Sequence, residues 1–450
     1  MNIIGVVGLV LSLVLLIYLT MKGINIIIAA LLSSVLVAVT GGLNLATALK
    51  EDYMSGFTDY FSSWFLVFLL GAIFGKVMQE TKSAESIAQW IKHTFGTKRA
   101  VFAVVAAAAI MTYGGVSLFV VGFAVYPIAV SLFRAANLPH RFIPAALVFG
   151  SISFTMTAPG SPEIQNIIPT EYFGTTPTAG GFIGFLCAFF VMVAGGFWLG
   201  RLVRKAKEDG EFFMLPQEMA SAKNESASAV EAGELQEKEQ TEIKQLPAIL
   251  ISILPLALVI VLLNILGQFM NPTTALLIAL AAGIAFASIT MSKFLSDFWG
   301  SLAIGTQNAL VALANTCAVV GFGSVAAQVS AFDNLVDSLV NMPGPPLLSL
   351  ALGVTIVCGI TGSASGGLGI ALPILSPIYL SQGLDPGGMH RISALASGGI
   401  DSLPHNGYVV TTIRAICGES HKRAYKPIFI LSVLVPLIAM FLAVILYSIF

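Results

Sequence analysis

Two short polar stretches combine residues that could exchange a proton with residues that could bind an anion. TAPGSPEIQN, residues 157–166, contains Glu163, and DSLPHNG, residues 401–407, contains Asp401 and His405. Removal from water disfavours the charged form of a carboxylate or an imidazole, which brings proton exchange towards the working range of pH. These three residues are therefore the candidate proton carriers. The alternatives are that Asp401 caps a helix, that Glu163 faces water and that His405 only packs.

Prolines in both stretches predict that a helix is interrupted there. Proline removes a backbone donor, so nearby carbonyls and amides lose their partners within the helix and become available to a ligand. The N-terminus of the following half-helix carries a positive partial charge that suits a small anion. The groups expected to complete this site are Thr155, Thr157, Gly160, Ser161, Gln165 and Asn166 in the first half, and Ser402, His405 and Asn406 in the second.

Two glycine-containing stretches are predicted to form the tips of helical hairpins. They are TYGGVS, residues 112–117, and TGSASGG, residues 361–367. Glycine lets the backbone approach a ligand closely, although small residues also allow tight helix packing in a membrane. The binding candidates here are Tyr113, Gly114, Gly115, Ser117, Thr361, Ser363, Ser365 and Gly366. None of the four stretches contains arginine or lysine, which favours a small monoanion over a citrate-like trianion.

Composition places these stretches in a membrane protein. Of 450 residues, 56% are hydrophobic and 10% are charged. Apolar runs of about 20 residues recur along the chain, and helices are the default crossing element because a backbone in lipid must satisfy its own hydrogen bonds. The first run, residues 3–20, is expected to be a retained helix and not a signal peptide. The expected fold class is an all-α polytopic membrane protein without a cofactor, a metal site or a nucleic-acid partner, and the four cysteines are expected to pack.

An internal repeat is predicted on either side of a polar linker. Residues 205–245 contain ten of the 23 acidic residues and five lysines, a composition that cannot bury a core. The pairs His140-Arg141 and His390-Arg391 lie 250 residues apart, and each precedes one of the polar stretches. Amphipathic stretches at residues 83–94 and 331–341 also correspond. The expected halves are 1–204 (scaffold helices 1–80, hairpin and broken helix 99–175) and 246–450 (scaffold helices 246–328, hairpin and broken helix 346–416).

The distribution of basic residues predicts that the halves are inverted. Each half is expected to have about five transmembrane helices, with a re-entrant hairpin and a discontinuous helix, and an odd number of crossings inverts the second half. With the N-terminus outside, 20 of the 22 basic residues fall inside, and only Lys50 and Arg391 remain outside. Both termini are then periplasmic. Inverted halves with broken helices are typical of secondary transporters.

The polar stretches also carry a resemblance to a known family. The segments LVFGSISFTMTAPGSPEIQNIIP (147–169), TGSASGGLGIAL (361–372) and HRISALASGGIDSLPHNGYVVTTI (390–413) resemble the gluconate permease (GntP) family of proton symporters in the ion transporter superfamily, and are most similar to its D-β-hydroxybutyrate permease-like branch. The resemblance implies proton-coupled uptake of a small hydroxy- or sugar-acid anion across a bacterial inner membrane. It also implies a homodimer, with binding loops at residues 113–117, 155–166, 361–367 and 401–406. DSLPHNG differs from the gluconate-specific members, which favours a shorter substrate such as 3-hydroxybutyrate.

Other functions remain to be weighed against this one. Within transport, the alternatives are a gluconate, other sugar-acid or lactate-like permease, a sodium-coupled carboxylate transporter and an exchanger. A channel is less favoured because the titratable groups and the hairpin tips suit a carrier. An intramembrane aspartyl protease would need a second aspartate at the depth of Asp401, and a serine hydrolase would need a G-x-S-x-G motif, whose spacing GSASGG lacks. An enzyme is therefore not expected.

Overall fold

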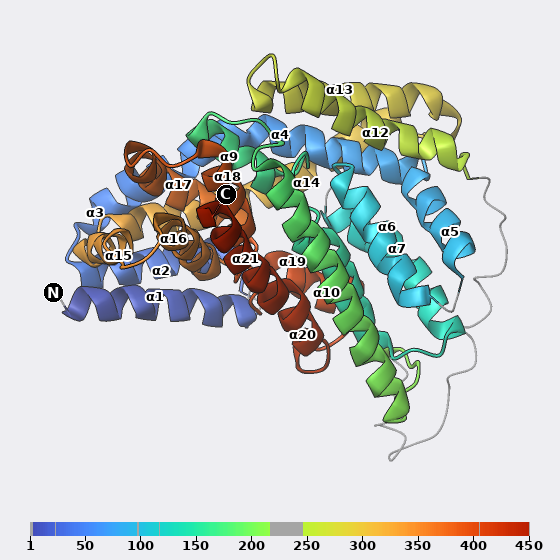
Figure 1. Cartoon of the computed structure of the whole chain (residues 1–450), viewed down its shortest axis with the longest axis horizontal. Coiled ribbons are helices and arrows are strands. Elements are labelled where there is room, and N and C mark those ends of the chain that lie inside the picture. Colours follow the sequence, from blue (N-terminus) through green and yellow to red (C-terminus); the bar gives the residue numbers. More distant parts are fainter. Residues whose placement is uncertain are drawn as a thin grey trace.

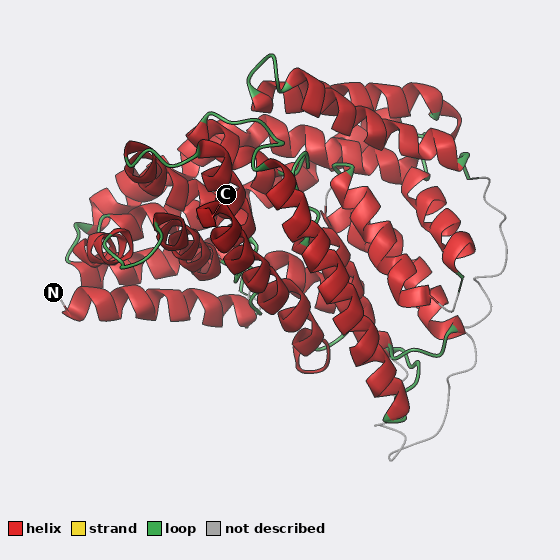
Figure 2. Ribbon diagram, in the orientation of Figure 1, coloured by secondary structure: helices red, strands yellow, loops and turns green. Residues whose placement is uncertain are grey.

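The computed structural model describes residues 3–22, 24–96, 99–116, 118–216, 246–404 and 406–449. Ser117, His405 and residues 217–245 of the predicted linker thus lie outside the described residues, as does the side chain of Thr361. Helices and their connections make up all of the described part (Figure 2). Seven of the described helices are long and apolar enough to cross a bilayer, and several shorter apolar helices accompany them.

The first half begins with a helical hairpin and ends with a long helix. Its elements are α1 (Ile3–Met21), α2 (Ile26–Gly41), α3 (Leu45–Thr47), η1 (Ala48–Tyr53), α4 (Met54–Glu80), α5 (Ser83–Phe95), α6 (Ala100–Tyr113), α7 (Leu118–Ala135), η3 (His140–Phe142), α8 (Ile143–Val148), η4 (Phe149–Ser153), α9 (Ile164–Phe173) and α10 (Gly181–Glu208). Residues 154–163, between η4 and α9, are not helical and are called the first break. The prolines in this segment explain the interruption.

The second half has a similar order of long helices but differs in its short elements. They are α12 (Ile249–Leu266), α13 (Pro272–Thr290), η5 (Ser292–Phe294), α14 (Phe298–Ala327), α15 (Ser330–Val340), α16 (Pro346–Thr361), α17 (Ala364–Ser381), α18 (Pro386–Ser397), α19 (Gly407–Thr411), η6 (Thr412–Ile416), α20 (His421–Phe429), η7 (Ile430–Leu434) and α21 (Val435–Ile449). The second break separates α18 from α19 at residues 398–406. The short helices α5 and α15 lie where the amphipathic stretches predict them.

The two long helices α4 and α14 form the most extensive contact between two described helices, and the outer hairpins pack across it. α2 packs against α14 and α13 against α4, so each hairpin contacts the long helix of the other half. In Figure 1, α12 and α13 lie along one end of α4, while α1, α2 and α15 lie near the other. Small residues permit the close approach: a Cβ at Gly321 would lie 2.7 Å from the carbonyl oxygen of Tyr53, and one at Gly305 would lie 2.8 Å from Cα of Ile73.

Both ends of the predicted linker are attached to the first half. Helix α10 continues to Glu208, four residues into the segment expected to be linker. After it, both guanidinium contacts of Arg141 with Glu211 are 2.6 Å long. At the other end, Ser86 Oγ donates to the carbonyl of Pro247 at 2.8 Å. The start of the linker and the residue two positions after its predicted end therefore both have partners in the first half.

Candidate functional site

The first hairpin tip, residues 113–116 between α6 and α7, contacts the first break. Tyr113 Oη donates to the carbonyl of Pro159 at 2.8 Å. Gly115 has a φ of +89°, which favours glycine, and a Cβ there would lie 3.3 Å from Cγ of Pro162. Gly114 has a different role, because a Cβ at this position would lie 2.7 Å from Leu256. The packing alternative therefore accounts for Gly114, while Gly115 permits the turn.

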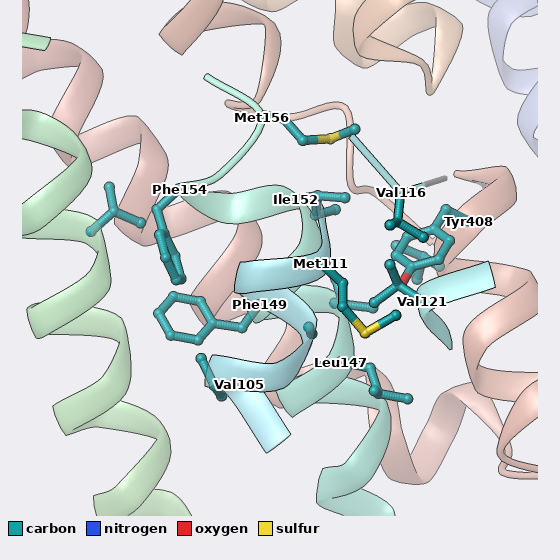
Figure 3. Close-up of a cluster of buried hydrophobic side chains, with 14 of the residues drawn as sticks. Val105, Met111, Val116, Val121, Leu147, Phe149, Ile152, Phe154, Met156 and Tyr408 are labelled. Atoms are coloured by element: carbon teal, nitrogen blue, oxygen red, sulfur yellow. The ribbon is translucent and has the colours of Figure 1, made fainter. Parts of the chain in front are cut away.

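Apolar side chains pack around this tip and around the beginning of the first break. Figure 3 shows residues from α6, α7, α8 and η4 packed together, with Tyr408 of the second half among them. Tyr408 Oη also donates to Ser151 Oγ at 3.2 Å. The first tip and the first broken helix are thus held in one apolar cluster that extends into the second half.

The carbonyls of the first break already accept hydrogen bonds from side chains. The bonds are Arg391 Nη1 to Thr157 O, Tyr113 Oη to Pro159 O, Asn264 Nδ2 to Gly160 O (3.0 Å) and Asn166 Nδ2 to Ser161 O (2.8 Å). These four carbonyls have lost their helical partners as expected, but each already accepts one hydrogen bond from a side chain and is not left unpaired for a ligand. Side chains from distant parts of the sequence replace the lost helical donors, as buried carbonyls require.

Other polar groups beside the first break have no such partner. The side-chain oxygens Oε1 of Gln165, Oδ1 of Asn264 and Oγ1 of Thr112 are buried without a hydrogen-bond partner among the described residues. Glu163 is the N-cap residue of α9, is partly exposed, and makes no capping bond through its side chain. The first turn of α9 therefore presents backbone amides that no side chain caps.

The second hairpin tip, residues 361–367 at the end of α16 and the start of α17, also contacts the second break. Asn406 Nδ2 donates to the carbonyl of Gly362 at 3.1 Å, and its Oδ1 accepts from the amide of Val409 at 2.9 Å. Asn406 thus caps α19 and ties the break to the tip. Ser363 Oγ caps α17 by accepting from the amide of Gly366 at 3.2 Å.

Asp401 is the buried carboxylate of the second break. It is 7% exposed, and its Oδ1 accepts from Ser402 Oγ at 2.9 Å. The carbonyl of Ser402 in turn accepts from Tyr425 Oη at 3.1 Å. Within the described part of the chain, no lysine, arginine or histidine forms an ion pair with Asp401. Because Asn406 is the N-cap of α19, Asp401 does not cap this helix.

Arg391 joins α18, the helix before the second break, to the first break. Its guanidinium is completely buried and donates to carbonyls of Thr157, Pro177 and Ala179 in the first half. The side chain of Thr157 reaches the second break, since a Cβ at Gly398 would lie 3.6 Å from Thr157 Cγ2. The sequence did not indicate that a cation outside the four polar stretches reaches the first of the two breaks. The available signal was that Arg391 is one of two basic residues that do not fit the inside distribution.

Two histidines make reciprocal contacts between the broken helices. His140, at the start of the first broken helix, contacts Glu419 just after η6, with 2.9 Å between Nδ1 and Oε1 and both side chains almost fully buried. His390 of α18 contacts Thr175 just after α9, with 2.6 Å between Nδ1 and Oγ1. Each histidine therefore links one broken helix to the end of the other. The sequence pairs the histidines, but it does not reveal these partners.

The expected site residues thus fall into three groups. The structure brings the first tip to the first break, the second tip to the second break, and the two breaks to each other. The buried candidates are Thr155, Thr157, Ser161, Gln165, Asn166, Ser365, Asp401, Ser402 and Asn406, together with Gly114, Gly160 and Gly366. Tyr113, Gly115, Glu163 and Ser363 are partly exposed. Ser117, His405 and the side chain of Thr361 lie outside the described part.

Comparisons with known proteins agree with this architecture. The model of the GntP family permeases matches residues 1–386. The "Uncharacterized transporter YxjC" of Bacillus subtilis is 34% identical, over 97% of this chain and 98% of that protein. The YdaH transporter of Alcanivorax borkumensis is 16% identical and has a TM-score of 0.51, covering 89% of this chain and 87% of that one, which shows a shared fold. The chain belongs to the GntP family of permeases, and it is a multi-pass membrane transporter and not an enzyme.

Proposed function

We propose that this permease is a proton-coupled symporter that imports a small hydroxycarboxylate, such as 3-hydroxybutyrate, by alternating access. The observation that carries the proposal is Asp401, a buried carboxylate without an ionic partner in the described residues, placed where the second break meets the second tip. An isolated carboxylate in a membrane interior is costly as an anion. Binding a proton removes this cost, which is the property a coupling residue needs.

The substrate's carboxylate is proposed to bind at the N-terminus of α9. This ten-residue helix has no side-chain cap, and its first amides and positive partial charge favour an anion. The polar residues of the two tips and breaks supply the remaining contacts for hydroxyl and carboxylate oxygens. The choice of a four-carbon acid over a longer sugar acid rests on the sequence DSLPHNG of the second break, which differs from the gluconate-specific members.

Asp401 is the proposed proton carrier, with Glu163 and His405 as the other candidates. Sodium coupling is the second candidate function, and one observation favours it. Gln165 Oε1, Asn264 Oδ1 and Thr112 Oγ1 are buried oxygens without described partners, and side-chain oxygens are the ligands that a hard cation prefers. The two candidates differ in the gradient that drives uptake.

The proposed architecture is a pair of inverted halves, residues 1–204 and 246–450, joined by a cytoplasmic linker at 205–245. The repeated order of elements and the exchanged packing of α2 on α14 and α13 on α4 support it. The hairpins α6–α7 and α16–α17 are proposed to be re-entrant, and the breaks with their hairpins form the moving unit. We place the protein in a bacterial inner membrane as a homodimer, with both termini periplasmic.

The test is uptake of labelled D-3-hydroxybutyrate into proteoliposomes under an inward proton gradient without sodium. Wild-type protein should accumulate the substrate, and a protonophore should abolish accumulation. Asp401→Asn should lose gradient-driven accumulation but retain substrate exchange between equal concentrations, because the neutral amide imitates the protonated carboxyl and can no longer take up or release a proton. Asp209→Asn, at an exposed position after α10, is the matched control and should behave as wild type.

Other outcomes separate the alternatives. Uptake that requires a sodium gradient and ignores protons would replace proton coupling with sodium coupling. Uptake of gluconate or lactate but not D-3-hydroxybutyrate would change the substrate and leave the coupling proposal to the same gradient test. Wild-type rates of accumulation in Asp401→Asn would show that another group carries the proton.

A further inference from the structure

Arg391 is a buried cation whose described partners are all uncharged. It donates from Nε to the carbonyl of Ala179 at 3.1 Å, and from Nη2 to Ala179 at 2.8 Å and to Pro177 at 3.3 Å. Nη1 donates to the carbonyl of Thr157. Within the described residues no carboxylate forms an ion pair with it. A buried charge is expensive, so a position that keeps one without a counter-charge calls for a function.

The three acceptor residues lie on both sides of α9. Thr157 belongs to the first break, which precedes the helix, and Pro177 and Ala179 belong to the loop that follows it. Two further bonds close the same network, from the amide of Gly160 to Pro177 O at 2.8 Å and from Asn166 Nδ2 to Pro177 O at 2.9 Å. A planar guanidinium can bridge several carbonyls at once, whereas an ammonium is a point donor. Arg391 therefore fixes the segments before and after α9 against each other.

Two glycines of α10 and the loop before it make room for this side chain. A Cβ at Gly184 would lie 2.9 Å from Cδ of Arg391 and 2.7 Å from Cγ of Pro159. A Cβ at Gly180, where φ is +75°, would lie 2.4 Å from Cβ of Arg391. On the same helix, Gly200 has no neighbouring atom within 4 Å of such a Cβ. Gly184 and Gly200 therefore provide a matched pair of positions for testing the packing of Arg391.

We propose that Arg391 is a positioning residue of the transport site. It holds the first break and the loop of residues 174–180 in the shape that presents the N-terminus of α9 to the substrate. Its uncompensated positive charge makes this region a site for an anion. The effect on an anion rests on the proposed function, whereas the positioning role concerns the protein without substrate.

Hydrogen–deuterium exchange without substrate tests the positioning role. In Arg391→Gln, amides of residues 157–181 should exchange about tenfold faster or more, because charge-assisted bonds to three carbonyls are lost. Amides of the second tip should exchange as in wild type. Gly184→Ala retains the guanidinium but displaces it, and should give the same pattern, whereas Gly200→Ala should not. Unchanged exchange in residues 157–181 of Gly184→Ala, or of a folded Arg391→Gln, would overturn the proposal.

Uptake kinetics test the effect on the anion. Arg391→Gln should raise the KM for D-3-hydroxybutyrate about tenfold or more, while Arg391→Lys, which keeps the charge but not the bridge, should keep KM within about threefold and lower the maximal rate. Arg141→Gln, 250 residues earlier and paired at the surface, is the control and should match wild type. A wild-type KM in Arg391→Gln would overturn the charge role. Absence of uptake by wild-type protein would contradict the proposed function, and the exchange experiment would still decide the positioning role.

Discussion

Removal of His140 should destabilise the protein strongly, because it separates a buried pair. His140→Ala loses the 2.9 Å contact with Glu419 and the 3.1 Å contact with Tyr126 Oη, and it leaves a carboxylate side chain that is 1% exposed. A hydrogen bond to a charged group contributes about 1.5–3 kcal/mol, and a buried carboxylate that loses its partner adds to this cost. Since Arg423 still faces Glu419 at 3.4 Å, part of the added cost is avoided, and we expect the free energy of unfolding to fall by about 3 kcal/mol.

Equilibrium unfolding in mixed dodecylmaltoside and SDS micelles, followed by tryptophan fluorescence, measures this loss. The control is Arg141→Ala, which breaks the partly exposed pair with Glu211 and should cost about 1 kcal/mol or less. A double-mutant cycle of His140→Ala and Glu419→Ala should give a coupling energy of about 1.5–3 kcal/mol. The His390 contacts with Thr175 and Asn166 involve neutral partners, so His390→Ala should cost less, about 1–2 kcal/mol.

Two results would contradict a stabilising contact between His140 and Glu419. If His140→Ala and Arg141→Ala lower the unfolding free energy equally, burial does not strengthen the contact between His140 and Glu419. If the cycle shows no coupling, the two side chains do not stabilise each other, and the link between the two broken helices must depend on apolar packing alone.

Three further predictions address other contacts. Gly367→Ala should lower the unfolding free energy by about 2–3 kcal/mol in the same assay, because its Cβ would lie 2.5 Å from Cα of Cys358, whereas Gly71→Ala, with no atom nearby, should not. The Arg141 guanidinium lowers the pKa of Glu211, so the pair stabilises the protein above the usual glutamate pKa, and this contribution disappears as pH falls through the lowered value. At pH 7 the free energy of unfolding of Glu211→Gln should therefore be lower than that of wild type by about 1 kcal/mol or less. At pH 3 this difference should vanish. Asn406→Ala loses both a helix cap and the bond to Gly362, and should lower the free energy of unfolding by about 2 kcal/mol. The control Asn271→Ala loses only the exposed cap of α13 and should lower it by about 1 kcal/mol. Equal losses in the two variants would argue against a stabilising bond between Asn406 and the second tip.

The sequence predicts the interruptions of the helices better than it predicts their partners. Proline and glycine act locally, so Pro159, Pro162 and Pro404 mark both breaks, and the glycines mark both tips. The donors that satisfy the first break come from elsewhere in the chain. Asn264 lies in a largely apolar helix, and Arg391 lies more than 200 residues away in sequence, so only the folded structure can show that they reach these carbonyls.

The glycines illustrate the same limit. One sequence pattern, glycine in a predicted tip, has at least two physical causes here. Gly115 permits a left-handed turn, while Gly114 and Gly367 allow another helix to approach closely. Which cause applies depends on the neighbouring helix, and neither Leu256 nor Cys358 can be paired with these positions from local sequence alone. Only the structure therefore shows which of these glycines could allow ligand contact and which serve helix packing.

The reciprocal contacts of His140 and His390 determine how force passes through the molecule. Each broken helix is fastened near its beginning to the end of the other, so a displacement of one is transmitted to both ends of its partner. Separate sliding of either helix would break buried hydrogen bonds, whereas a shared displacement would break none of them. We therefore expect the two broken helices to move together as one rigid body, so that the polar groups of the two breaks keep their spacing.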